Sequence, residues 1–285
     1  MNSRFFLMLT TALAPLIWGS TYLVTTEFLP PDRPLYAALL RVLPAGMLLL
    51  LWTREFPPRR ELPRLFLLGM LNIGFFQAML FVSAYRLPGG LAAILTSTQT
   101  LMVMVLTAWL GMQRPPLSAW LAAGIGVLGI AMLVYAPGVR FDVVGIVAAL
   151  LTALAGALGG FFTKYWHTSL SLLAFTGWQL LFGGLCLLPL ALWFEPPLPA
   201  LTLTHVGGYL YLCLLGSVLA YVLFFRGISK LPVAVAMSLG LLSPVSAFIL
   251  GWLFLGQSMD GKAVFGFVLA LVSIFGVQRA LQAKK

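Results

Sequence analysis

The chain has 285 residues and a formal net charge of +10, yet only 8% of its residues are charged and its mean hydropathy is +1.03. Soluble domains carry about 25% charged residues, so this composition excludes a water-soluble fold and predicts an integral membrane protein. The basic residues lie in short segments between apolar runs and form no basic face, which argues against a nucleic-acid partner.

Ten apolar runs follow one another along the chain, separated by short segments that contain Pro, Gly and charged residues. A helix that crosses a bilayer needs about 20 mostly apolar residues. The first run follows Arg4 and lacks a small-residue cleavage site, so we expect a retained helix and not a signal peptide. The sequence therefore predicts an all-α integral membrane protein with ten transmembrane helices, at about 5–27, 34–52, 63–84, 88–110, 117–136, 142–163, 171–193, 204–226, 232–255 and 261–279.

Lysine and arginine are unevenly divided between the two sets of connections. If the N-terminus is cytoplasmic, the segments on that side carry 12 of these residues and the segments on the outer side carry 4. Cytoplasmic loops of membrane proteins are enriched in Lys and Arg. We therefore expect a multi-pass membrane protein, with lipid around it and with both termini in the cytoplasm.

The chain contains a repeated segment. "YRLPGG" leads into the fourth run and "ISKLPV" into the ninth, and Leu87-Pro88 aligns with Leu231-Pro232 at an offset of 144 residues. Each half holds an odd number of helices, so the second half enters the membrane upside down. This predicts two inverted five-helix repeats, residues 1–137 and 138–285, as in many secondary transporters.

These features, with Trp18-Gly19-Ser20 in the first span and Arg41 in the second, resemble the drug/metabolite transporter superfamily, in particular its EamA-type ten-helix members. The chain is most similar to the bacterial aromatic amino acid exporters, and this resemblance implies a location in the bacterial inner (plasma) membrane. The resemblance implies a cavity lined by the third, fourth, eighth and ninth helices, helped by the first and sixth, and export of amino acids by alternating access. Many relatives have Leu-Gly-Glu at the ends of the fourth and ninth helices. Here Leu110-Gly111-Met112 and Leu255-Gly256-Gln257 replace it, so no role of those acids is carried over.

Five polar residues, Thr96–Thr100, interrupt the fourth run. Counted from Pro88, they lie roughly 12–18 Å deep in an apolar core about 30 Å thick. Ser and Thr can bond a backbone carbonyl of their own helix, whereas the amide of Gln99 needs other partners. Two interpretations remain open: contacts between helices, or a polar wall of the substrate cavity with Ser97 and Gln99 as contacts.

The same offset places Gln99-Thr100 opposite Ser243-Pro244 in the ninth span. Proline removes a backbone hydrogen bond, and paired interruptions near the membrane midplane point to a binding site in inverted-repeat transporters. Pro244 as a simple kink is the alternative. We expect Ser243 to contact substrate and Pro88, Pro232 and Pro244 to act as helix breaks or hinges.

Other candidate contacts are aromatic, amide and hydroxyl side chains at depth within the spans. Such a mixture suits an amino acid zwitterion with a variable side chain, and it suits many other small polar metabolites. Arg41 is compatible both with structural pairing and with a transport role, so we assign it neither. The remaining candidates are Trp18, Tyr22, Asn72, Gln77, Phe81, Tyr85, Trp178 and Tyr221.

All seven carboxylates fall near the ends of spans or in connections. Proton-coupled carriers commonly use carboxylates or histidines within the membrane. We therefore expect facilitated transport without an obligatory proton, with no cofactor or metal. A proton-coupled exporter of drugs, purines or other metabolites is the alternative. An intramembrane enzyme is disfavoured because no catalytic motif is present, a channel remains a minor alternative, and a monomer is compatible with the sequence.

Overall fold

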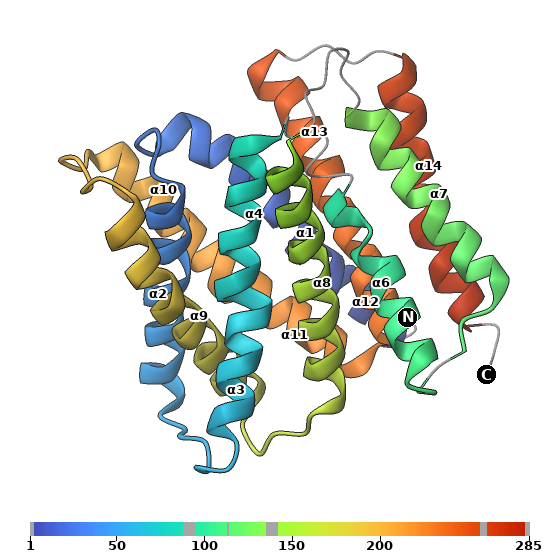
Figure 1. Ribbon diagram of the computed structural model, residues 1–285, viewed down its shortest axis with the longest axis horizontal. Helices are drawn as coiled ribbons and strands as arrows, with labels where there is room; N and C mark the ends of the chain where they lie inside the picture. Colours follow the sequence, from blue (N-terminus) through green and yellow to red (C-terminus); the bar gives the residue numbers. More distant parts are fainter. Residues whose placement is uncertain (1–2, 88–94, 113, 135–141, 257–260, 283–285) are drawn as a thin grey trace.

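The computed structural model of the chain describes residues 3–87, 95–112, 114–134, 142–256 and 261–282. Every regular element in these ranges is helical (Figure 1). Two of them, η1 and η2, are π-helical turns and η3 is a 3₁₀ turn. In chain order the elements are α1 (Ser3–Phe28), α2 (Pro34–Thr53), α3 (Leu62–Gly69), η1 (Met70–Gly74), α4 (Phe75–Arg86), α6 (Gln99–Trp109), α7 (Leu117–Val134), α8 (Val143–Tyr165), α9 (Leu172–Phe194), α10 (Leu203–Cys213), η2 (Leu214–Leu219), α11 (Ala220–Lys230), α12 (Val233–Ser238), η3 (Leu239–Leu241), α13 (Leu242–Leu255) and α14 (Gly261–Gln282).

Several of these elements join into single rods that match the expected spans. The third span is α3, η1 and α4, the eighth is α10, η2 and α11, and the ninth is α12, η3 and α13. Among the described residues, eight helices are long and apolar enough to cross a membrane and a shorter apolar helix covers 117–132. The fourth span is described only from residue 95 onward. The prediction of an all-α membrane protein is confirmed.

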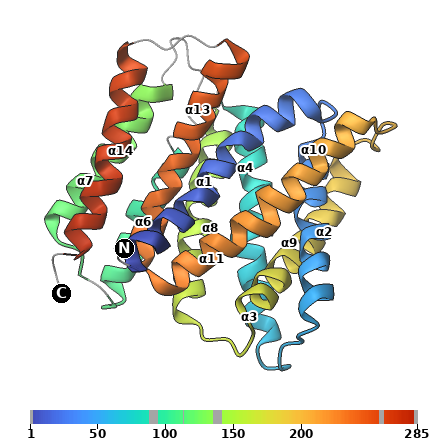
Figure 2. The same ribbon diagram turned by 180° about the vertical axis from the view of Figure 1, so that it is seen from behind.

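The main contacts between helices are symmetric: a pair of packed helices has an equivalent pair formed by their counterparts in the other half of the chain. α2 packs on α9 and α7 packs on α14, and in each pair one helix is the counterpart of the other. α1 packs on α13, as its counterpart α8 packs on α6 (Figures 1 and 2). α4 packs on α8, as α11 packs on α1. Two inverted five-helix repeats produce this pattern of contacts.

Acidic side chains at the ends of the helices satisfy backbone N–H groups. The first turn of a helix leaves its N–H groups without partners in the helix. Glu195, which follows α9, accepts hydrogen bonds from the backbone N–H groups of Leu35 (2.6 Å) and Tyr36 (2.9 Å) in the first turn of α2. Asp142 caps α8 by accepting from the N–H of Gly145 at 2.8 Å. These two carboxylates therefore stabilise helix ends at the edges of the bundle.

Glycine residues allow the helices to come close in two pairs, α2 with α9 and α7 with α14. A Cβ added to Gly46 of α2 would lie 2.5 Å from the backbone nitrogen of Leu181 in α9. A Cβ added to Gly129 of α7 would lie 2.7 Å from the backbone nitrogen of Ala270 in α14. In lipid, helices associate mainly through such close packing, because the bilayer supplies no hydrophobic drive between apolar helices.

Candidate functional site

The third and eighth spans each contain a π-helical turn, and the two turns occupy equivalent places. η1 begins at Met70 and η2 at Leu214, 144 residues later, which is the offset that aligns the two Leu-Pro segments. A π turn inserts one extra residue into a helix, weakens its regular hydrogen bonding and is frequent at functional sites. The two repeats therefore share a symmetric irregularity within the membrane-spanning part of the bundle.

A cluster of amide and hydroxyl groups surrounds η1. The side-chain N–H₂ of Asn72 donates to Oε1 of Gln179 at 2.7 Å and to Oγ1 of Thr163 at 3.0 Å. Gln179 is fully buried, and its Nε2 has no hydrogen-bond partner among the described residues. A buried amide N–H₂ without an acceptor is costly. This donor is thus available to an acceptor that enters the site.

A matching cluster surrounds η2. The backbone carbonyl of Gly216 accepts hydrogen bonds from Nε1 of Trp18 at 2.9 Å and from Nη2 of Arg41 at 3.1 Å. Nε of Arg41 lies 3.5 Å from Oγ of the neighbouring Ser217. Arg41 as a whole is 5% exposed, and a charged residue buried within a membrane span is rare. The π turn thus presents a carbonyl to an indole and to a buried cation.

The two clusters are related by the internal symmetry of the chain. Asn72 and Gly216 are 144 residues apart, and Arg41 and Gln179 are 138 apart, as are the first residues of α2 and α9. Arg41 in the first repeat reaches η2 in the second, and Gln179 in the second repeat reaches η1 in the first. The arrangement is symmetric, but Arg41 carries a charge and its counterpart Gln179 does not.

Gln77 and Tyr221 meet on the two helices that follow the π turns, α4 after η1 and α11 after η2. Nε2 of Gln77 lies 3.4 Å from the Tyr221 hydroxyl, and the two residues are 144 positions apart, so equivalent positions of the two repeats touch. The ring of Tyr221 lies 5.1 Å from the ring of Trp18, which also contacts Phe224 at 5.0 Å. Gln77 is 3% exposed and Tyr221 5%, so water does not reach this contact in the described conformation. We call Trp18, Gln77 and Tyr221 the central triad.

The structure brings together part of the predicted set. Trp18, Gln77 and Tyr221 form the central triad and Asn72 lies in the η1 cluster. Phe81 is one helical turn after Gln77 and packs, half-buried, against the main apolar core. Pro88 and the side chains of Tyr22 and Tyr85 lie outside the described residues.

Trp178 is not deep in its span, and that expectation was wrong. Its Nε1 donates to the backbone carbonyl of Glu55 at 3.0 Å, in the connection that follows α2. Its ring contacts Phe56 in the same connection at 6.0 Å. Trp178 is only the seventh residue of α9, so it anchors an end of the helix and lies apart from the central triad.

Gln99 lies where α6, α8 and α12 meet. Its Nε2 approaches Sδ of Met237 at 3.0 Å, and its amide rests on Gly156 of α8. A thioether is a weak acceptor, so these contacts satisfy the amide only in part. The hydroxyl of Thr98 donates to the carbonyl of Leu95 within its own helix at 2.6 Å, as expected. Ser97 is half-buried.

The interruption in the ninth span lies beside the first helix. Ser243 and Pro244 are the second and third residues of α13, the helix that directly follows the 3₁₀ turn η3. The carbonyl oxygen of Ser243 would lie 2.6 Å from a Cβ on Gly19, which neighbours Trp18 of the central triad. Pro232 lies at the start of the ninth span, as expected, but the prediction that it breaks a helix is wrong. It is the N-cap of α12, so it starts the helix and does not break one.

Four residues of the two clusters were not predicted as site residues: Thr163, Gly216, Ser217 and Gln179. The repeat offset of 144 residues could have indicated some of these positions. Applied to the third span, it aligns position 77 with 221 and position 72 with 216. The signal is weak because the paired residues differ in type, an amide against a phenol and an amide against a glycine.

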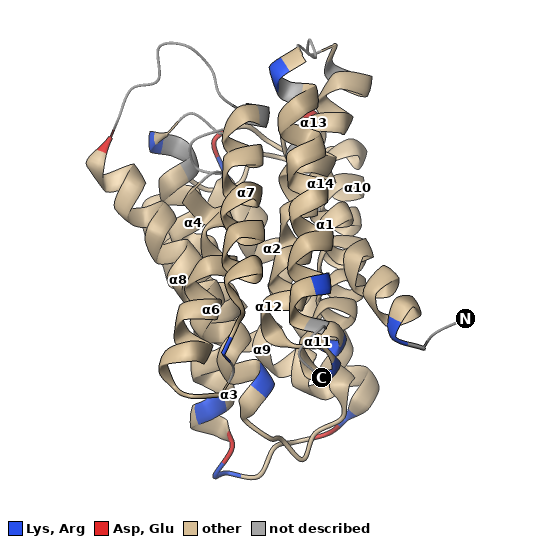
Figure 3. Cartoon of the chain, turned by 90° about the vertical axis from the view of Figure 1, so that its right-hand side faces the viewer, with Lys and Arg blue, Asp and Glu red and all other residues tan. Residues whose placement is uncertain are grey.

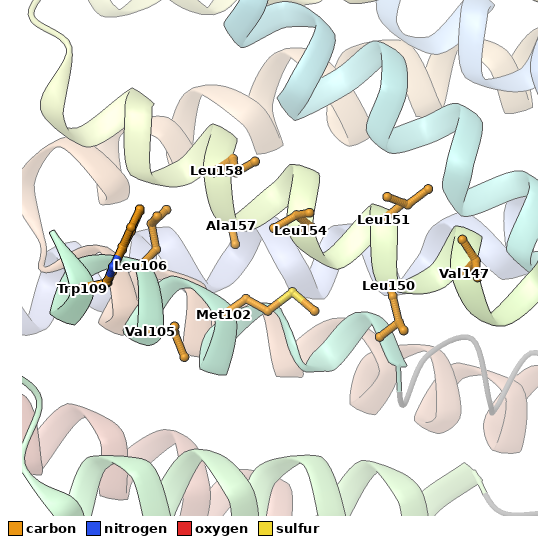
Figure 4. Close-up of a pocket in the computed structure, with 10 residues that line it drawn as sticks. All are labelled: Met102, Val105, Leu106, Trp109, Val147, Leu150, Leu151, Leu154, Ala157 and Leu158. Atoms are coloured by element: carbon orange, nitrogen blue, oxygen red, sulfur yellow. The ribbon is translucent and has the colours of Figure 1, made fainter.

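A separate groove lies between α6 and α8, and Figure 4 shows ten apolar side chains that line it. Its volume is about 440 Å³. Val105, Trp109 and Leu154 of its lining are exposed on the outside of the bundle. The groove therefore faces the bilayer, and its chemistry suits acyl chains and not a polar substrate.

Comparison with known proteins adds independent findings. The model of the EamA-like transporter family matches residues 5–135 and again residues 143–279. The chain is 44% identical to Protein PecM of Dickeya dadantii over 268 residues, covering 93% of this chain and 90% of that protein. It is 29% identical to the uncharacterized inner membrane transporter YedA of Escherichia coli, covering 89% and 87%. A solved crystal structure superposes with a TM-score of 0.84 over 99% of this chain and all of the other, at 17% identity.

Proposed function

The chain belongs to the EamA-like transporter family, and we propose that it exports amino acids, aromatic ones among them, or closely related small metabolites from the cytoplasm. It is a multi-pass membrane transporter of a small molecule and not an enzyme. The cargo, the direction of transport, the bacterial inner membrane as its location and the mechanism are parts of the proposal.

The central triad is the observation that carries this proposal. Gln77 and Tyr221 touch across the axis that relates the two repeats, and the Trp18 ring packs beside them. Inverted repeats alternate access by exchanging conformations around a site at their interface. Aromatic faces bind apolar side chains, and amides, hydroxyls and the nearby guanidinium of Arg41 bind the polar ends of an amino acid. The buried triad corresponds to a closed state that opens toward one side at a time.

The proposed orientation places both termini in the cytoplasm. In Figure 3, Lys and Arg gather in the lower half of the bundle, where both chain ends lie, and fewer lie at the upper end. Positive residues are retained on the cytoplasmic side during membrane insertion. Export then carries substrate from the basic end of the bundle to the opposite end.

The proposed transport needs no proton. The described carboxylates lie at helix ends or in connections, and Glu195 and Asp142 are engaged with backbone N–H groups there. Intramembrane carboxylates are the usual proton carriers in coupled exporters. Substrate therefore moves down its own gradient.

Counterflow in proteoliposomes tests the proposal. We expect a radiolabelled aromatic amino acid to enter vesicles preloaded with unlabelled substrate, with saturation and trans-stimulation. The rate is expected to stay the same when the pH gradient is collapsed with an ionophore. A rate that falls to the background of empty vesicles would establish proton coupling. Competition by purines or cationic drugs, with none by amino acids, would replace the proposed cargo, and flux without saturation would indicate a channel.

Gln99→Ala tests whether the polar stretch of α6 contributes to the substrate cavity. We expect the apparent substrate affinity to fall about fivefold, because loss of one hydrogen-bonding group changes binding by about 1 kcal/mol. Thr107→Ala is the control, since that hydroxyl donates to the carbonyl of Val103 in the same helix at 2.9 Å. Unchanged affinity in folded Gln99→Ala protein would assign Gln99 to helix packing alone.

A further inference from the structure

A polar pocket lies at the basic end of the bundle, away from the central triad. It has a volume of about 480 Å³ and lies between the connection that precedes α3 and the connection that joins α8 to α9. In Figure 3 this is the lower end of the bundle, where α3 begins and where Lys and Arg gather. Its lining residues are Arg60, Glu61, Arg64, His167, Thr168 and Ser169.

The carboxylate in this pocket is held by the opposite connection. Oε2 of Glu61 accepts from Oγ1 of Thr168 at 2.8 Å and from the N–H of Ser169 at 3.2 Å, and Oε1 accepts from Oγ of Ser169 at 3.0 Å. Burial raises the pKa of the Glu61 carboxyl, but these hydrogen bonds and the charge of Arg60 outweigh it and lower that pKa. Glu61 therefore stays ionised and serves as a brace between the two connections.

The two arginines keep their positive charge available. Among the residues that the structure describes, neither Arg60 nor Arg64 forms an ion pair within 4.0 Å. Both are exposed on the pocket wall, and the hydrogen bonds of the Glu61 carboxylate go to Thr168 and Ser169 of the opposite connection. Guanidinium groups in this state are matched in geometry and charge to phosphate oxygens.

Aromatic side chains place the pocket at the level of the membrane interface. The Arg64 guanidinium lies 5.8 Å from the centre of the Trp166 ring, which stacks on Phe162 at 4.3 Å. Trp166 directly follows α8, and Phe66, two residues after Arg64 on α3, is exposed. Tryptophan at the end of a spanning helix marks the headgroup region of the bilayer. The pocket thus combines two cationic side chains with aromatic side chains typical of the headgroup region.

We propose that this pocket binds the phosphate of an anionic membrane phospholipid. Basic pockets between transmembrane helices on the cytoplasmic side hold such headgroups. The two connections that form the pocket come from different repeats, so the lipid would hold the repeats together at this end. A free phosphate ion shares the headgroup chemistry, but it does not use the interfacial aromatic surface. The inference does not depend on the identity of the transported cargo.

The test compares the purified full-length chain with charge-neutral variants in a neutral detergent. Short-chain phosphatidylglycerol is titrated while the midpoint of thermal unfolding is followed, with phosphatidylcholine and inorganic phosphate as separate arms. We expect saturable stabilisation by phosphatidylglycerol alone. Each arginine near a membrane surface contributes about fivefold to anionic-lipid binding, so R60Q and R64Q are expected to weaken it about fivefold each and the double variant about thirtyfold.

Arg59→Gln is the matched control, because Arg59 is exposed in the same connection and is not part of the pocket lining. It is expected to bind phosphatidylglycerol as the unmodified chain does, and R60K/R64K is expected to recover most of the lost affinity. Equal responses of R59Q and the double glutamine variant would overturn the proposal. Saturation by inorganic phosphate at similar concentrations, lost in the same variants, would also overturn it in favour of a free-anion site.

Discussion

Replacing Tyr221 with leucine is expected to weaken substrate binding about tenfold or more, because the substrate would lose an aromatic face, worth about 0.5–1.5 kcal/mol, together with a hydroxyl, worth about 1 kcal/mol. The Tyr221 ring lies 5.1 Å from Trp18 and 5.7 Å from Phe225, and its hydroxyl faces Gln77. Leucine fills much of the same space, so the helix packing is retained. The measurement is the concentration dependence of counterflow, with binding followed by tryptophan fluorescence.

The control for this prediction is the same substitution at Tyr209. Tyr209 is also buried, lies in α10 of the same span, and its hydroxyl has no hydrogen-bond partner among the described residues. Tyr209→Leu is expected to alter stability to a similar degree and to leave substrate affinity within about twofold. If both variants bind substrate equally well, the central triad is a packing feature and the substrate site lies elsewhere.

Among glycine-to-alanine substitutions in this chain, Gly46→Ala is expected to cause the largest loss of stability. The new Cβ would lie 2.5 Å from the backbone nitrogen of Leu181 and 2.9 Å from the carbonyl oxygen of Gly177. Backbone atoms cannot rotate away as a side chain can, so α2 and α9 must separate. Overpacking of this kind costs about 1–3 kcal/mol and corresponds to a fall in Tm of about 5 °C or more.

Gly124→Ala adds the same methyl group to α7, where no atom lies within 4 Å of the added Cβ. Because alanine also favours helix over glycine, the control variant is expected to keep or slightly raise its Tm. Both proteins are measured at one heating rate in the same detergent, since membrane proteins often unfold irreversibly. A Gly46→Ala midpoint equal to that of Gly124→Ala would contradict the close approach of α2 and α9.

The separation of α2 from α9 has a second consequence that transport assays can detect. Arg41 lies five positions before Gly46 on α2 and reaches the carbonyl of Gly216 at 3.1 Å. A shift of α2 would lengthen this contact. We therefore expect Gly46→Ala to lower the counterflow rate even at temperatures where the protein remains folded.

The membrane spans could be predicted from the sequence because the bilayer imposes a local rule. Every backbone group within the apolar core must be satisfied inside its own helix, so each span is a continuous apolar run. The expected span 142–163 is observed as Val143–Tyr165, and 171–193 as Leu172–Phe194. The Leu-Pro repeat likewise gave the offset of 144 that relates η1 to η2.

The site was only partly predictable, because depth and orientation depend on neighbouring helices. Trp178 was expected in the interior, but the connection after α2 folds back and offers the Glu55 carbonyl to its indole N–H. Gln99 was correctly singled out as a side chain needing outside partners, but the sequence could not name Met237 and Gly156 as its neighbours. Its role in substrate binding stays a prediction.

The sequence by itself determined the class of the protein, its ten spans and the inverted repeat, because hydropathy and chain symmetry act along the chain. Only the tertiary structure decided that Gln77 meets Tyr221, that Arg41 and Gln179 occupy equivalent places, and that both π turns lie beside them. The apolar segments Met70–Gly74 and Leu214–Leu219 carry no local signal for a π turn. η1 contacts α9 and η2 contacts α2, helices that are far from them in the chain, so the surroundings of each turn are set only when the helices pack together.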